Sequence, residues 1–209
     1  MKRGLRTLIV TGLLMACIIP VGAQVDFGVR AGVGRTSLTQ KIDLDYRSGS
    51  QLGYSMGVLA DIPFYRRFSF RPEIALVNQG GNYFSLYDQD AGLLTYDCNY
   101  YSLKSFLNIA FNIPISGVRM AIFGGVVPDF YLGGKMKVID NRESPSYSHK
   151  QKMKPFDLGV NSGISVEYKK IFFSIDITCG TFDRRRDKVE EESRVFQNNL
   201  TFSMGYFFR

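Results

Sequence analysis

The chain has 209 residues, of which 26 are lysine or arginine and 19 are aspartate or glutamate, for a formal net charge of +7. Lys2, Arg3 and Arg6 supply part of this excess, and the remainder is spread thinly, which argues against nucleic-acid binding. With 21 glycines, 12 tyrosines and 17 phenylalanines, the composition favours strands and turns over helices.

The N-terminus has the pattern of a secretory signal peptide, in which positive residues precede an apolar run at residues 8–21. We expect residues 1–23 to be removed by cleavage after Ala23. The run is shorter than the roughly 20 residues that a spanning helix needs. A lipoprotein signal at Cys17 is the alternative, but Met15 fits that pattern poorly, and cleavage there would leave an apolar tail on the product.

Apolar residues alternate with small, polar or charged residues in eight segments, which is the period of a β-strand. The segments are residues 25–38, 52–62, 68–78, 100–113, 118–134, 156–168, 171–180 and 195–208. Short connections follow the even segments, at residues 63–67, 114–117 and 169–170. Long connections follow the odd segments, at residues 39–51, 79–99, 135–155 and 181–194. This order of tight turns and long loops is typical of outer-membrane barrels.

One alternate set of positions carries the strongly polar residues: Arg30, Arg71, Glu73, Lys104, Asn108, Arg119, Asp129, Asp157, Asn161, Glu167 and Asp176. An arginine or lysine that faces lipid near the bilayer midplane costs about 2–4 kcal/mol, so this set must face the lumen. An open sheet edge in hydrocarbon would leave backbone groups unpaired, so the sheet must close. The sequence therefore predicts an all-β protein at residues 24–209. Its expected fold is an eight-stranded antiparallel up-and-down transmembrane β-barrel, with short periplasmic turns and long extracellular loops, in a Gram-negative outer membrane.

Aromatic residues gather near the ends of the predicted strands, as expected for two interfacial girdles. Phe64, Tyr65, Phe111, Tyr168 and Phe208 lie near the short turns, whereas Tyr54, Tyr101, Phe130 and Phe156 lie nearer the long loops. Pro72 and Pro128 fall inside strands, where we expect a bulge or a local break in the ladder of backbone hydrogen bonds.

Several stretches resemble the porin-family outer-membrane β-barrel domain, in particular its PorT-like group. They are residues 27–34 (FGVRAGVG), 122–129 (IFGGVVPD), 156–160 (FDLGV), 163–168 (GISVEY) and 200–208 (LTFSMGYFF). The resemblance implies an outer-membrane location and, for some members, a part in a protein secretion apparatus. It also implies that the closing strand, with Phe202, Tyr206 and Phe208, is a C-terminal signal that the barrel-assembly machinery reads. Arg209, after the aromatic residue, departs from that pattern.

The lumen charges predict a packed structural network, because the interior of eight strands is just filled by side chains. Lys104, Asp129 and Asp157 are expected toward the long loops, and Arg71, Glu73, Arg119 and Glu167 toward the short turns. A pathway for protons or ions is the alternative.

No pattern for catalysis, a cofactor or a metal site stands out. The only histidine, His149, lies in a polar connection, and a lone loop histidine is usually solvated. Gly32-Val33-Gly34 lies within a strand, and Ser37 occupies the third glycine position of a nucleotide-binding fingerprint. Cys98 and Cys179 are expected to stay unpaired. The mixed-charge stretch 183–192 is expected to be a solvated outer loop that contacts lipopolysaccharide phosphates or neighbouring loops rather than nucleic acid.

These observations favour a non-enzymatic structural or binding protein of the cell envelope that acts through its extracellular loops. The expected partners are outer-membrane lipid, lipopolysaccharide, the barrel-assembly machinery and a protein of the envelope or of a secretion apparatus. A narrow pore for ions or small solutes is the main alternative. A lipid-modifying enzyme that depends on His149 and a soluble periplasmic ligand-binding barrel are weaker alternatives.

Overall fold

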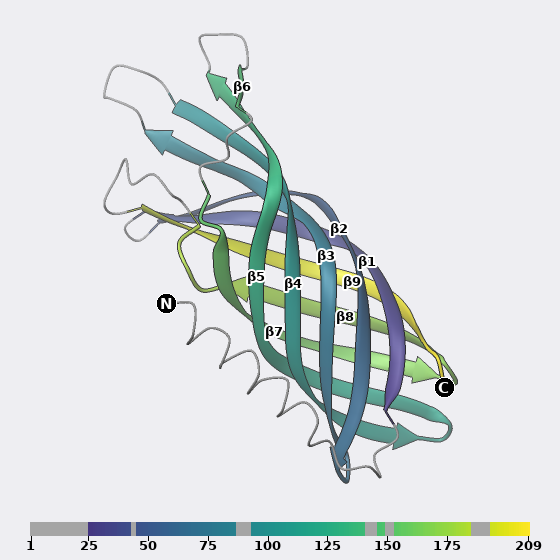
Figure 1. Cartoon of the computed structure of the whole chain (residues 1–209). Coiled ribbons are helices and arrows are strands. Elements are labelled where there is room, and N and C mark those ends of the chain that lie inside the picture. The colour runs from purple at the N-terminus through teal and green to yellow at the C-terminus, as the bar shows by residue number, and fades with distance from the viewer. Residues whose placement is uncertain (1–24, 43–44, 87–92, 141–145, 149–152, 185–192) are drawn as a thin grey trace, which may run out of the picture.

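Eight long strands close into one antiparallel barrel in a computed structural model, which describes residues 25–42, 45–86, 93–140, 146–148, 153–184 and 193–209 (Figure 1). The barrel strands are β1 (Asp26–Ile42), β2 (Asp45–Tyr65), β3 (Phe68–Leu86), β4 (Leu93–Ile115), β5 (Val118–Asp140), β7 (Phe156–Tyr168), β8 (Ile171–Gly180) and β9 (Ser193–Phe207). A short ninth strand, β6 (Ser146–Ser148), extends the edge of β5. The predicted fold class is confirmed.

Closure of the barrel depends on β1, which pairs with β2 on one side and with β9 on the other. The β1–β9 ladder runs from Gly28 opposite Phe207 to Ile42 opposite Ser193. The start of β1 and the end of β9 therefore lie at the same end of the barrel (Figure 1). In the described part of the chain, no helix has the length and apolar character needed to cross a membrane.

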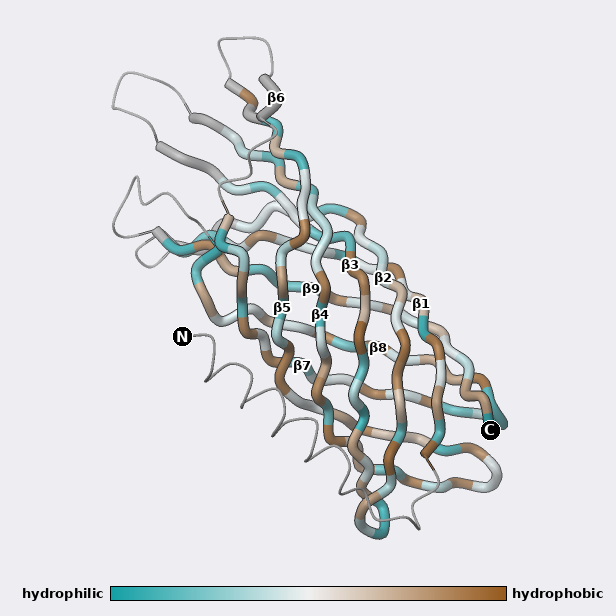
Figure 2. The backbone as a smooth tube through the Cα atoms, viewed as in Figure 1, coloured by the Kyte–Doolittle hydropathy of each residue, from teal (hydrophilic) through white to brown (hydrophobic). Residues whose placement is uncertain are grey.

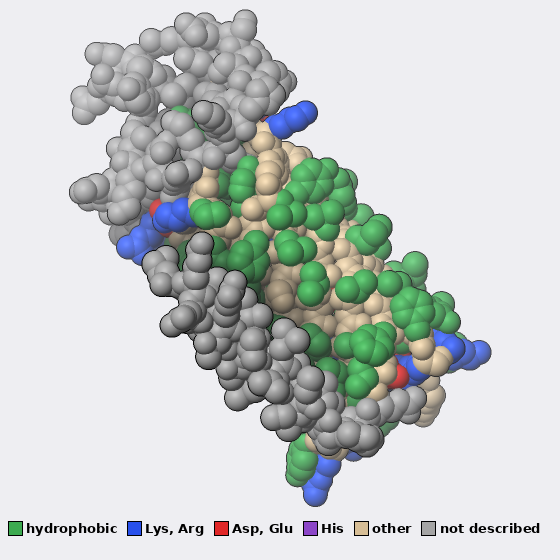
Figure 3. Space-filling model, in the orientation of Figure 1, with side chains coloured by type: hydrophobic (Ala, Val, Ile, Leu, Met, Phe, Trp, Pro, Cys, Tyr) green, Lys and Arg blue, Asp and Glu red, His purple; other side chains and the backbone are tan. Residues whose placement is uncertain are grey.

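Within the membrane-spanning part of the barrel, side chains alternate between the lumen and the outer surface. Along β8, Phe172, Ser174, Asp176 and Thr178 are buried, whereas the residues between them are exposed. Hydrophobic residues recur along each barrel strand in Figure 2, and in Figure 3 hydrophobic side chains cover the visible wall while lysines and arginines gather toward its ends. Because hydrocarbon replaces water outside, exposed apolar side chains stabilise the barrel in its membrane.

The three short connections are two-residue turns. Arg66, Ser116 and Lys169 each begin one of them with a positive φ, at 43°, 40° and 58°, and Gly117 follows Ser116 at 87°. Positive φ values match the twist of antiparallel strands in tight hairpins. The sequence predicted the two-residue length only at 169–170. The predicted connections at 63–67 and 114–117 are too long, because β2 and β4 continue through Pro63 and Pro114.

The predicted long connections at 39–51 and 79–99 are wrong in part, because the strands continue through much of both. The β1–β2 ladder extends to the pair Ile42–Asp45, and the β3–β4 ladder extends to Leu86–Leu93. The periodic signal ends near the membrane surface, since beyond it neither face of a hairpin contacts lipid. Backbone pairing does not need that signal and therefore continues.

Strand lengths divide the wall into a high side and a low side. Strands β2 to β5 have 19–23 residues, whereas β7 has 13 and β8 has 10. Irregular segments complete the low side through backbone hydrogen bonds. Tyr131 N donates to Pro155 O at 2.8 Å, Lys154 N to Arg184 O at 2.8 Å, and Arg184 N to Val195 O at 2.9 Å.

Both strand prolines coincide with a local break in the ladder. The pairs of β2 with β3 lapse between Leu59–Glu73 and Ile62–Phe70, across Pro72, and resume without a shift. The pairs of β4 with β5 lapse across Pro128 in the same way. A proline cannot donate to the neighbouring strand, which explains the gap.

Candidate functional site

Three layers of ion pairs fill the lumen, and the lowest lies nearest the short turns. Asp61 on β2 is completely buried between two arginines. Its Oδ1 accepts a hydrogen bond from Arg71 Nε at 3.1 Å, and its Oδ2 lies 2.8 Å from Arg119 Nη1. Arg71 also donates to Ser165 Oγ at 3.1 Å, and Arg119 Nε donates to Glu167 Oε2 at 2.9 Å. These contacts link β2, β3, β5 and β7 across the lumen.

Arg209, just beyond β9, closes the lowest layer from below. Its Nε lies 3.3 Å from Asp26 Oδ2, and its Nη2 pairs with Glu167. Its guanidinium also lies 5.4 Å from the ring centre of Phe207. Arg209, the residue that departs from the family pattern, thus forms ion pairs at the periplasmic end of the barrel.

The middle layer is a triad around Arg30 of β1. Arg30 Nε donates to Glu73 Oε1 and Arg30 Nη1 to Asp176 Oδ1, both at 3.0 Å. The guanidinium also lies 5.3 Å from the ring centre of Phe106. All four side chains are buried, so one arginine joins β3 and β8 through the centre of the barrel.

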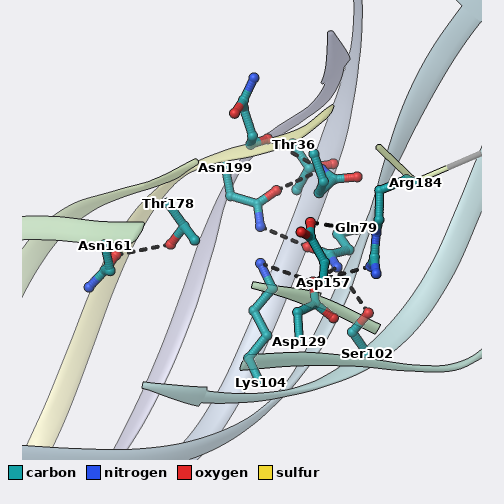
Figure 4. Close-up of polar contacts among 12 residues, drawn as sticks. Thr36, Gln79, Ser102, Lys104, Asp129, Asp157, Asn161, Thr178, Arg184 and Asn199 are labelled. Carbon is teal, nitrogen blue, oxygen red and sulfur yellow. Dashed lines mark hydrogen bonds and ion pairs between the residues drawn. The ribbon is translucent and has the colours of Figure 1, made fainter. Parts of the chain in front are cut away.

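The upper layer surrounds Asp129 of β5 (Figure 4). Its Oδ2 lies 3.8 Å from Lys104 Nζ and 3.2 Å from Arg184 Nη2. Gln79 Nε2 donates to the same oxygen at 2.8 Å. Arg184 Nε also lies 3.9 Å from Asp157 Oδ2. Two cations thus face two carboxylates in a layer that is almost fully buried.

The structure brings together all nine residues of the expected lumen network, although in three separate layers. Sequence reasoning missed Asp26, Asp61, Arg184 and Arg209. Asp61 occupies the inward phase of its predicted strand, so the alternation alone could have identified it. Arg184 corrects a prediction, because it was expected in a solvated loop and is instead 0% exposed. Its loop has no periodicity from which that burial could be inferred.

The packed side chains leave little free space in the middle of the barrel. A cavity of about 20 Å³ lies between Arg30, Arg71, Glu73, Asn108 and Ser174. A space of this size holds about one water molecule. At this level the buried side chains of Arg30, Glu73 and Asp176 occupy the lumen.

Above the three layers, a hydrophobic cluster closes the extracellular mouth. We call it the cap core, and it consists of Leu38, Tyr83, Cys98, Tyr100, Met136, Met153 and Val195. Tyr100 joins it to the upper layer, because its hydroxyl donates to Gln197 Oε1 at 2.8 Å and accepts from Arg184 Nη2 at 3.3 Å.

The outer half of β3 leans over the mouth. Its pairing with β2 ends at Asn78, and beyond that point Gly80 contacts β1. Gly80 N donates to Thr36 Oγ1 at 3.1 Å, and Gln197 Nε2 donates to Gly80 O at 3.4 Å. The mouth is therefore covered by backbone as well as by side chains.

Both cysteines outside the expected signal peptide are free, as predicted. Cys179 is exposed on the outer surface. Cys98 falls within the predicted connection 79–99, but in the structure it lies on β4 within the cap core. Burial, with a smaller contribution from Asp97, raises the pKa of the Cys98 thiol to about 12.

The residues of the expected assembly signal lie on β9 or directly after it. Phe202, Tyr206 and Phe208 all point outward, with 51%, 39% and 62% of their surface exposed. Their side chains lie among the lipid-facing residues and take no part in the three ion-pair layers.

Two kinds of residue bear on the expectations about catalysis and metals: His149 and groups of side chains that could ligate a metal. His149 lies outside the described residues. Among those that are described, no group of three or more histidine, cysteine, aspartate or glutamate side chains is placed to hold a metal ion. Gly32 and Gly34 lie in the middle of β1, not in a loop.

The fold and the filled lumen define a transmembrane β-barrel with an inverted distribution of polarity. Residues 22–184 match the family described as outer membrane protein beta-barrel domain, and the chain belongs to this family. The protein is accordingly located in the outer membrane of a Gram-negative bacterium. No curated protein matches the chain.

The chain is similar to several solved structures at low sequence identity. A major outer membrane protein from Thermus thermophilus is 13% identical over 88% of this chain and 99% of that chain, with a TM-score of 0.50. Ail, the attachment invasion locus protein of Yersinia pestis, is 15% identical over 88% and 99%, with a TM-score of 0.43. OprG of Pseudomonas aeruginosa is 16% identical over 90% and 97%, with a TM-score of 0.45.

Proposed function

We propose that this protein is a non-enzymatic, non-conducting component of the outer membrane that binds a partner protein through its extracellular end. The observation that carries the proposal is the contrast between the two parts of the barrel. The lumen is filled by three ion-pair layers, whereas the outer parts of β3, β4 and β5 project past the other strands, above a hydrophobic core to which β1 and β9 also contribute. A rigid projection without a channel suits recognition better than transport.

The partner is a protein of the envelope or of a secretion apparatus. Support for the secretion role comes from the resemblance to the PorT-like group, and the family match supports only the coarser placement in the outer membrane. The outward aromatic residues Phe202, Tyr206 and Phe208 would act earlier, as the signal that the barrel-assembly machinery reads.

A narrow pore is the competing function. It would require Arg184 to leave its site between Asp129 and Asp157, because these residues occupy the upper lumen. Nothing in the described side-chain packing favours that displacement, so we place the pore second.

In vivo photo-crosslinking tests the binding role. A photoreactive residue at Arg194, which is exposed at the extracellular start of β9, should give a discrete protein adduct in intact cells. The same residue at Lys170, which is exposed in a periplasmic turn, should not give that adduct. Loss of the gene should also change the set of secreted or surface proteins. If Arg194 gives no discrete adduct and that set is unchanged, the proposed function is wrong.

A further inference from the structure

A bulge in β5 reshapes the outer surface next to the extracellular aromatic girdle. Ser102 of β4 pairs with Tyr131, but its neighbour Tyr101 pairs with Gly133, so that Leu132 has no partner. Tyr101 and Leu132 are 40% and 57% exposed. Beyond the bulge the alternation is shifted, and Gly133 and Lys135 face outward. Bulges commonly redirect side chains in this way.

The bulge opens a groove between β4 and β5 with a volume of about 570 Å³. The groove is lined by Asn99, Tyr101, Leu132, Gly133, Gly134 and Lys135. The space above Gly133 is empty, since a Cβ added there would have no atom within 4 Å. A larger side chain at this position would extend into the groove. One part of the lining is therefore apolar, and the other carries the amide of Asn99 and the ammonium of Lys135.

Lys135 is exposed and has no hydrogen bond or ion pair within the described part of the chain. Arg35 on β1 is also exposed, and it likewise has no hydrogen bond or ion pair with a described residue. Both lie two residue pairs beyond the girdle. Arg35 comes two pairs after Val33–Tyr54, and Lys135 comes two pairs after Tyr101–Gly133. The hydroxyl groups of Tyr54 and Tyr101 lie 2.7 Å apart, which fixes the level of this girdle.

Outward basic residues just beyond an aromatic girdle lie at the level of lipid head groups. An arginine or lysine deeper in the lipid would be costly, and at the interface that cost falls to about 0–1 kcal/mol. Phosphate is the abundant anionic group at this level, and lysine binds it as a compact positive charge. The groove lies in the extracellular half of β4 and β5, at the level where the outer leaflet of a Gram-negative outer membrane presents lipopolysaccharide.

We propose that the groove between β4 and β5 binds one lipopolysaccharide molecule through its lipid A part. Lys135 contacts a phosphate, Asn99 contacts the sugar to which the phosphate is attached, and an acyl chain lies along Tyr101 and Leu132. The proposal does not depend on the protein-binding role proposed above, because the groove faces the lipid rather than the extracellular space.

Native mass spectrometry of the purified full-length barrel, with added lipid A or phosphatidylglycerol as the probe, tests this site. The wild-type protein should retain one lipid A molecule more strongly than phosphatidylglycerol. Lys135→Gln should weaken lipid A binding about tenfold, as expected for the loss of one charge-assisted contact. Gly133→Leu should weaken it similarly, because the new side chain fills the groove. Lys170→Gln, which removes an exposed charge at the periplasmic turn, should bind like the wild type.

The heat-dependent gel shift of each variant checks that the barrel is folded. If folded Lys135→Gln and Gly133→Leu both bind lipid A like the wild type, the proposal is wrong. If the wild-type protein retained phosphatidylglycerol as strongly as lipid A, the assignment of the ligand as lipid A would be wrong. If Lys170→Gln weakened lipid A binding as much as Lys135→Gln does, the assignment of the binding site to this groove would be wrong.

Discussion

Arg184 shows how one residue can connect the cap to the lumen. It reaches the upper layer from the segment after β8 and places its guanidinium against Tyr100, Asp129 and Asp157. A buried ion pair contributes an uncertain net free energy, since both partners lose their hydration. Removal of one partner is costly in every case, because the remaining charge stays buried without compensation.

Arg184→Ala should lower the free energy of unfolding by about 3–5 kcal/mol. In this variant Lys104 is the one cation of the upper layer that remains to compensate the buried carboxylates of Asp129 and Asp157. Urea unfolding in lipid vesicles, followed by the gel shift, measures this change. Arg194→Ala is the matched control, since Arg194 is exposed and has no ion pair with a described residue; it should stay within about 0.5 kcal/mol of the wild type. Equal stability of the two variants would contradict the role assigned to Arg184.

The two free cysteines should differ sharply in reactivity. A membrane-permeant maleimide should label Cys179, which is exposed, and should leave Cys98 unlabelled at neutral pH. Cys98 is buried and its pKa is raised to about 12, so almost none of it is the reactive thiolate. Mass spectrometry of Cys98→Ser and Cys179→Ser proteins separates the two signals. Rapid labelling of Cys98 in the folded protein would show that the cap core is open.

Single residues also show the limit of what the sequence could predict. The inward position of Arg30 or Asp176 follows from alternation, because lipid on one side of a strand forces the charges to the other. Arg184 lies in an irregular segment where no period exists, so its partners become visible only when the chain is folded. The sequence predicted an upper and a lower set of lumen charges, but it placed Glu73 in the lower set, whereas Glu73 pairs with Arg30 in a separate middle layer. That layer was not predicted, because it depends on how far each strand is shifted against its neighbours.

At the level of elements, β3 has the feature with the greatest consequence for the cap. Gly80 and Gly81 have φ values of 155° and 146°, and both approach other backbone closely. A Cβ on Gly81 would lie 2.4 Å from Gly49 O and 2.5 Å from Leu38 N. These glycines let the backbone of β3 pass close to β1 and β2 where it covers the mouth of the barrel.

Gly81→Ala should lift the β3–β4 hairpin from β1 and destabilise the barrel by about 1–3 kcal/mol, because alanine is strained at this φ and collides with backbone. Limited proteolysis of intact cells should then cut the hairpin faster than in the wild type. Gly133→Ala serves as the control, since nothing lies within 4 Å of the added Cβ. If both variants resist the protease equally, the close contact at Gly81 has no role in holding the hairpin.

The elements that the sequence predicted best are those inside the membrane. All eight barrel strands follow from their alternation, and the positions of the three short turns follow from the gaps between them, although the sequence predicted the two-residue length only at 169–170. The extensions of β1–β2 and β3–β4 were assigned to loops, because a hairpin in water has no lipid-facing side to produce a regular pattern. The short strand β6 was missed for the same reason.

At the scale of the whole molecule, the protein is a barrel whose outside is apolar and whose inside is ionic. Closure by β1 and β9 removes the free edge that lipid would not tolerate. The lumen is filled by buried ion pairs, and the longer strands β2 to β5 make one side of the wall higher than the other. Together these features suit a fixed platform for contacts outside the cell.

Planar-bilayer recording of the purified wild-type protein tests the sealed lumen most directly. We predict no steady conductance, because Arg30, Arg184 and their carboxylate partners fill successive levels of the barrel. Arg184→Ala, in which the upper level is opened, should conduct more often than the wild type. A stable and reproducible conductance from the wild-type protein would contradict this account.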